Sequence, residues 1–208
     1  MDPSDSSMYV VYANSGRFVI GLETETGATM RQQVDLTAGT KVGGPDTLVD
    51  KPFVGGMTVD GNFLVTGYSD AAFYDLQNSL LTLVNSGEQV CNAAASVDPA
   101  NPNLMLFLNF QGEQNMTGDP TGAVGQHHII YFLDNTNTYQ DHIAVPTGIP
   151  EWQDPEWSTH PDYIVALGGE PAGPQHVYII RRSDKAVFKI TEGLTLNDTS
   201  TPHLWVGS

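Results

Sequence analysis

The chain has 208 residues and 40% of them are hydrophobic, which allows one sizeable core and is too apolar for a disordered chain. Only eight basic residues face 24 acidic ones, and the net charge of −16 makes nucleic acids and anionic membranes unsuitable partners. No apolar run approaches the about 20 residues that cross a bilayer, so we expect no membrane insertion.

The composition also bears on location. Residues 1–5 lack the basic and apolar regions of a signal peptide, so we expect no such peptide in this sequence. Cys91 is the only cysteine, which excludes an internal disulfide and a cysteine zinc cluster. Lys is scarce while Asn, Thr and Gly are plentiful, and this balance favours a secreted or periplasmic protein.

Short runs rich in Val, Ile, Tyr and Phe, each closed by turn residues, predict strands along the whole chain. In the N-terminal part these runs are residues 8–13, 17–23 and 30–36. The next group contains the runs 53–59, 62–67, 71–76 and 80–84. Asp60-Gly61 between the first two runs is a strong hairpin signal. Four strands in about 35 residues are what one propeller blade needs.

Two further groups follow the same pattern. The first has strands expected at 90–97, 104–109, 128–133 and 139–145, with a polar insertion at residues 111–126. The second has strands expected at 154–158, 163–167, 176–180 and 186–191. The sequence therefore predicts an all-β fold, a β-propeller of four four-stranded blades, or of five if residues 37–52 contain one more.

The two ends of the chain are expected to share a blade. Residues 202–206 resemble an inner first strand, and the N-terminal strands lack one. A C-terminal strand that completes the N-terminal blade would close the ring and remove two exposed sheet edges. The sequence thus predicts one propeller domain over residues 1–208, either a whole protein or a part excised from a larger secreted one.

Two segments carry a family resemblance. Pro155-Glu156-Trp157-Ser158-Thr159-His160-Pro161-Asp162 resembles the start of a blade in TolB-like propellers with PD40 repeats, where a Pro, an aromatic residue, Ser, Pro and Asp-Gly open each blade. Met57-Thr58-Val59-Asp60-Gly61-Asn62-Phe63-Leu64 is the second such segment. The resemblance covers most of the chain and implies a fold rather than a chemistry.

A third segment, residues 97–107, is similar to part of the oligogalacturonate lyases, which are TolB-like propellers that cleave pectin fragments. In that family, histidines near the inner strands hold a metal with the help of a Gln. Here Cys91-Asn92 stands in the neighbourhood of one such histidine. The resemblance implies a carbohydrate-active enzyme as an alternative function.

The histidines are candidate metal ligands. His127 and His128 precede a predicted strand and His203 opens the last one, so we expect His127 and His203 to approach each other near the axis. Glu113, Asn115 and Asp119 in the insertion are oxygen ligands suited to calcium. A divalent cation, calcium or a transition metal, is therefore a hypothesis, and ordinary surface histidines are the alternative.

Carboxylates and aromatic residues gather around the predicted inner strand at Trp157. Glu151 and Glu156 are candidate catalytic acids, with a solvated acidic loop as the alternative. Trp152, Trp157, Trp205 and Tyr68 are candidate stacking platforms for a sugar. Packing in the blade cores is the alternative for aromatics. We expect it for Trp157 and Trp205, and we expect Trp152 to be exposed.

The leading hypothesis is a non-catalytic binding propeller, secreted or periplasmic, that recognises a glycan or a protein ligand. The alternative is a polysaccharide lyase or glycoside hydrolase that acts on plant-type polysaccharide fragments. A third hypothesis is a structural part of a larger secreted protein, and a chain that forms only part of a ring would be open to self-association.

Overall fold

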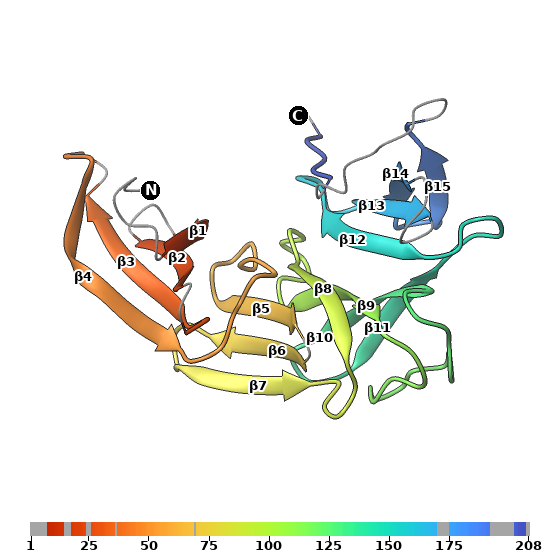
Figure 1. Cartoon of the computed structure of the whole chain (residues 1–208), viewed down its shortest axis with the longest axis horizontal. Helices are drawn as coiled ribbons and strands as arrows, with labels where there is room; N and C mark the ends of the chain where they lie inside the picture. Colours follow the sequence, from red (N-terminus) through yellow and green to blue (C-terminus); the bar gives the residue numbers. More distant parts are fainter. Residues whose placement is uncertain are drawn as a thin grey trace.

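The computed structural model describes residues 8–14, 18–23, 26–35, 37–68, 70–169, 175–191 and 202–206. The strands of this part form four antiparallel sheets (Figure 1). The first sheet contains β1 (Met8–Asn14), β2 (Phe18–Glu23), β3 (Thr29–Asp35) and β4 (Thr40–Val49), and the second contains β5 (Phe63–Tyr68), β6 (Asp70–Asp75) and β7 (Leu80–Val84). The third contains β8 (Val90–Ala95), β9 (Leu104–Asn109), β10 (Ile129–Asp134) and β11 (Tyr139–Ala144), and the fourth contains β12 (Trp152–Trp157), β13 (Tyr163–Gly169), β14 (Gln175–Arg181) and β15 (Ala186–Lys189).

Each sheet is built from strands that follow one another in the sequence. This order confirms the all-β prediction and places most strands within a residue or two of their expected positions. The middle strands β9 and β10 are apolar without alternation, because both of their faces are covered by a neighbouring sheet. No stretch of the described residues forms a helix with the length and hydrophobicity that a bilayer crossing requires.

The sheets stack face to face, and one hydrophobic cluster fills each gap between them. Ile20 and Phe53 belong to the cluster between the first and second sheets. Phe73 and Phe107 belong to the cluster between the second and third sheets. Phe132 meets Trp157 between the third and fourth sheets, with ring centroids 5.6 Å apart. The sheets follow a curved arc that is open between the first and the fourth (Figure 1).

The predicted closure of the ring is wrong for the described residues. The first sheet has its own inner strand, β1, and residues 202–206 form no strand. They lie instead against the fourth sheet, where the amide of Thr159 donates a hydrogen bond to the Leu204 carbonyl at 3.3 Å. Residues 37–52 are not a fifth blade either, because most of them form β4, the outer strand of the first sheet.

The segment before β5 departs from the predicted regular strand. It pairs with β5 through hydrogen bonds at Gly55, Gly56 and Thr58, and only Met57 forms a ladder bridge, to Leu64. The carbonyl of Gly55 also accepts a hydrogen bond from the amide of Ala95 in β8 at 2.6 Å. The second sheet therefore has an irregular inner edge, which lies directly beside β8.

Two glycines make this close approach possible. A Cβ at Gly55 would come within 2.6 Å of the Ala93 carbonyl oxygen, and one at Gly67 within 2.7 Å of the Ala93 Cβ. Neither distance is tolerated between real atoms, so only glycine fits at both positions. The absence of two side chains thus lets the second and third sheets meet at the inner side of the arc.

Candidate functional site

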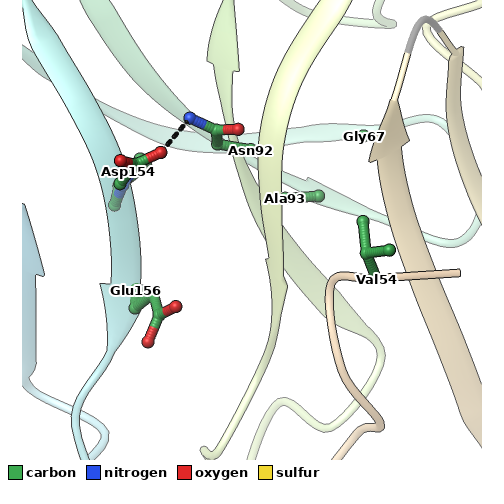
Figure 2. A pocket seen from close by; sticks show the side chains of 7 residues that line it. Val54, Gly67, Asn92, Ala93, Asp154 and Glu156 are labelled. Carbon is green, nitrogen blue, oxygen red and sulfur yellow. Dashed lines mark hydrogen bonds between the residues drawn. The ribbon is translucent and has the colours of Figure 1, made fainter. Parts of the chain in front are cut away.

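An inner pocket lies where the innermost segments of the second, third and fourth sheets meet. Strand β8 contacts both β5 and β12, so side chains of three sheets converge there. The pocket is lined by Val54, Gly67, Asn92, Ala93, Asp154, Pro155 and Glu156 (Figure 2). Its volume is about 170 Å³, and its polar groups come from β8 and β12.

Two β-bulges face each other across the inner pocket. The register of β8 on β9 shifts between Cys91 and Ala94, and the register of β12 on β13 shifts between Gln153 and Glu156. Within these bulges Asn92 has a φ of 46° and Asp154 a φ of 43°. Such a backbone is uncommon for residues other than glycine and gathers at functional sites, where a bulge re-aims a side chain.

The bulges bring the two side chains into contact. Asn92 Nδ2 donates a hydrogen bond to Asp154 Oδ1 at 2.5 Å, and Figure 2 shows both groups turned towards each other. Glu156, on the same strand as Asp154, projects its carboxylate into the space between β12 and β8 (Figure 2). The inner pocket therefore presents two carboxylates and one amide.

Burial leaves both carboxylates short of compensating charge. It raises the pKa of Asp154 above the ordinary aspartate value, and the nearby His127 opposes this only in part. Burial also raises the pKa of Glu156, the negative charge of Asp154 raises it further, and His203 lowers it. A cationic group that entered the pocket would relieve this shortage, because an opposite charge favours the ionised carboxylate.

One imidazole of the chain itself reaches Glu156. His203 Nδ1 lies 2.6 Å from Glu156 Oε2, while the His203 side chain is 78% exposed. The contact holds the C-terminal segment, residues 202–206, beside the inner pocket. A largely exposed imidazole thus already contacts one of the two carboxylates of the pocket.

A second polar cluster adjoins the inner pocket. Gln175 Nε2 donates to Gln153 Oε1 at 2.5 Å, and Gln153 Nε2 donates to Glu151 Oε1 at 2.7 Å. Glu151 Oε1 lies 3.9 Å from His127 Nδ1, which is too long for a hydrogen bond. Burial lowers the pKa of His127 more than Glu151 and Asp154 raise it, so the ring favours its neutral form.

The structure corrects two of the aromatic predictions. Trp152 is fully buried, because it packs against Tyr178 inside the fourth sheet's cluster, and it is therefore not the exposed platform. Trp205 is 81% exposed and lies outside the core, because the C-terminal segment joins no sheet. Trp157 is buried as expected. The side chain of Tyr68 lies outside the described residues.

The predicted histidine metal site is not formed. His127 adjoins Glu151, His203 contacts Glu156, and His128 is an exposed residue whose ring packs over Gly125. Among the described residues, no group of three or more His, Cys, Asp or Glu side chains is arranged to hold a metal ion. Glu151 and Glu156 are both near the pocket region, but Glu151 is tied to Gln153 and only Glu156 lines the pocket.

No sequence pattern singles out Asn92 or Asp154 as a site residue. The two residues come together because a bulge in β8 and a bulge in β12, which belong to different sheets, lie beside each other. The tolerance of Asn and Asp for a positive φ was the one local signal available. That signal is shared by every Asn and Asp of the chain, and it therefore singles out neither residue.

The fold has clear counterparts among solved structures. The TolB of Acinetobacter baumannii matches with a TM-score of 0.54 and 13% identity, over 85% of this chain and 41% of that one. A TolB-type protein of Agrobacterium tumefaciens matches with a TM-score of 0.57 and 14% identity, over 84% and 61%. A puromycin hydrolase matches with a TM-score of 0.59 and 15% identity, over 86% and 28%.

The fold is that of a TolB-like β-propeller. This confirms the family resemblance at the level of the fold, whereas the resemblance to oligogalacturonate lyases gains no support from these structures. No protein-family model matches the sequence, and no curated protein sequence matches it. The chain spans about two fifths to three fifths of the TolB chains, and the same fold occurs in TolB and in a hydrolase.

Proposed function

We propose that this chain is a non-catalytic β-propeller binding protein, secreted or periplasmic, which binds a protein ligand by taking a cationic side chain into the inner pocket. The observation that carries the proposal is the pair of half-buried carboxylates, Asp154 and Glu156, at the convergence of three sheets. The TolB-like fold supports a binding role outside the cytoplasm.

The size of the pocket favours a macromolecular ligand. Sites for free small molecules have volumes of about 300–1,000 Å³, whereas the inner pocket holds about 170 Å³. That volume suits the end of one side chain. A lysine fits this description well, because its ammonium is a compact point charge on a long apolar stem.

The charge of the chain favours the same class of ligand. The net charge of −16 attracts basic partners over long range and raises their rate of association. The two consecutive arginines of the fourth sheet already have partners within the chain. Arg181 pairs with Asp184 at 2.6 Å, and Arg182 lies over the rings of Phe132 and Trp157. A basic segment of a ligand would therefore meet little repulsion from positive charges.

The test is the binding of a short lysine peptide, acetyl-Gly-Lys-Gly-amide, compared with its glutamine counterpart, by NMR chemical-shift titration. The lysine peptide is expected to shift the amides of Asn92, Ala93 and Asp154. Asp154→Asn and Glu156→Gln should each weaken binding about tenfold or more, because hydrogen bonds to charged groups are worth about 1.5–3 kcal/mol. Glu113→Gln removes an exposed charge of the insertion and is the matched control. Equal affinities for the two peptides would contradict the proposal.

A glycan ligand is the second candidate, and the exposure of Trp205 favours it. Trp205 is 81% exposed and lies two residues from His203, so its ring is free to stack on a sugar beside the pocket. Trp205→Ala should then abolish any oligosaccharide binding seen on a glycan array while leaving the melting temperature unchanged. Retained binding in this variant would exclude Trp205 as the platform.

A further inference from the structure

The C-terminal segment, residues 202–206, is tethered at two points of the fourth sheet. One is Thr159, whose amide donates to the Leu204 carbonyl at 3.3 Å and whose Oγ1 accepts from the Val206 amide at 2.9 Å. The other is Glu156, 2.6 Å from His203. The segment thus runs along the end of β12, and one of its two anchors lines the inner pocket.

These tethers are weak. Within the segment the side chains of His203 and Trp205 are 78% and 81% exposed, and Thr159 is exposed as well. Exposed ion pairs contribute about 0.2–1 kcal/mol, and hydrogen bonds in exposed backbone open locally without global unfolding. The segment can therefore leave the fourth sheet while the sheets stay folded.

The position of His203 has a direct consequence for binding. Its imidazole holds the Glu156 carboxylate, which is one of the two groups that the proposed function assigns to the ligand's cation. The imidazole already occupies Glu156 Oε2, so a ligand cation that binds through both carboxylate oxygens must displace His203. The chain thus carries its own competitor for the inner pocket.

We propose that residues 202–206 form a displaceable strap in which His203 competes with the cationic group of the ligand for Glu156. The inference rests on the proposed function, since it concerns the same carboxylate. A ligand would have to displace the strap, which would lower the affinity of every ligand that binds Glu156 by the same factor.

The competition depends on pH through Glu156, because the imidazole binds most strongly to the ionised carboxylate. His203 faces Glu156, and behind Glu156 lies Asp154 on the same strand, which His127 in turn influences. Acid releases the strap as Glu156 is protonated, and this occurs at a higher pH than for an exposed glutamate because burial raises the pKa of Glu156.

The strap itself is tested without any ligand, by NMR amide exchange of Val206 and Thr159. In His203→Gln we expect both amides to exchange faster at pH 6, and in the matched control His128→Gln, another exposed histidine, we expect no change. Exchange at Val206 that is the same in the wild type and in His203→Gln would overturn the strap, whatever the peptide titration shows.

The competition is tested with acetyl-Gly-Lys-Gly-amide at pH 6. The peptide should bind His203→Gln about two- to fivefold more tightly than the wild type, the change expected from the loss of an exposed ion pair. Peptide binding of equal strength to both proteins would overturn the competition and leave the proposed function standing. Failure of the peptide to bind either protein would overturn the proposed function and the competition together.

Discussion

Asp154 combines two features that each cost stability. Its φ of 43° is unfavourable for a residue with a Cβ, and burial raises the pKa of its carboxyl. Residues that reduce stability in this way are retained where a site needs them. The pairing of Asp154 with Asn92, which shares the same backbone conformation, is therefore better explained by a role in binding than by a role in folding.

The raised pKa of Asp154 predicts how the substitution Asp154→Asn changes the melting temperature. Because the pKa of Asp154 is raised in the folded state, the contribution of this group to stability falls as pH rises from the ordinary value of 3.8 through the raised pKa. The variant lacks this loss, so it should melt higher than the wild type at pH 7, with a smaller difference at pH 3.5. Asp98→Asn should do the opposite, since hydrogen bonds from Asn101 and Ala100 help lower the pKa of Asp98. Calorimetric melting at the two pH values checks both signs, and a wild type that melts higher at pH 7 than Asp154→Asn would refute the assignment.

The close approach at Ala93 predicts the effect of Gly67→Ala. The added Cβ would meet the Ala93 Cβ at 2.7 Å, and overpacking of this kind costs about 1–3 kcal/mol. Gly44→Ala, in open space on β4, is the matched control and should change stability little. Urea unfolding measures both changes. The double variant Gly67→Ala/Ala93→Gly should recover part of the loss, and no recovery would show that the backbone of β8 is the obstacle.

At the level of the elements, the insertion of residues 111–126 is held by the end of β7. Asn85 is fully buried, and its Nδ2 donates to Gln114 Oε1 at 2.8 Å while its Oδ1 accepts from the amide of Asn115 at 2.7 Å. Its own amide donates to Asn137 Oδ1 at 2.7 Å. One side chain of the second sheet thus fixes the longest loop of the third.

Asn85→Ala should therefore loosen the insertion. It leaves the buried Gln114 Oε1 and the amide of Asn115 without their partner, and an unsatisfied buried group costs about 1–3 kcal/mol. Hydrogen exchange should accelerate within residues 111–126 and stay unchanged in β12. Asn85→Gly separates the causes, since it loses the same hydrogen bonds but tolerates the φ of 47°. Unchanged exchange in both variants would mean that Asn85 does not anchor the insertion.

The strands show which features of the fold could be predicted from the sequence. Strands such as β9 and β10 are uniformly apolar and bounded by turns, so their positions follow from composition. Strand β4 contains Gly43-Gly44-Pro45, which is typical of a turn, and an exposed edge strand tolerates it. The site depends on Asn92 and Asp154, which lie in different sheets and meet only through stacking, and no local pattern encodes such a meeting.

The whole molecule carries 24 acidic and eight basic residues, so repulsion between like charges opposes the compact state. Salt should screen this repulsion, and the melting temperature should rise between 10 and 300 mM NaCl, over which the Debye length falls from about 30 Å to less than 8 Å. Choline chloride at the same ionic strength should act equally if screening is the cause. A larger rise with calcium chloride at matched ionic strength would instead reveal a cation site outside the groups described here.

The arrangement of each sheet as one continuous stretch of sequence has a consequence for synthesis on the ribosome. The first sheet is complete at Val49, and no strand contributed by the described C-terminal residues is needed to finish it. Chains emerge at about 5–20 residues per second, so a sheet has seconds to form before the next one follows. We expect the arc to assemble in order from the N-terminus, with each new sheet docking on a finished neighbour.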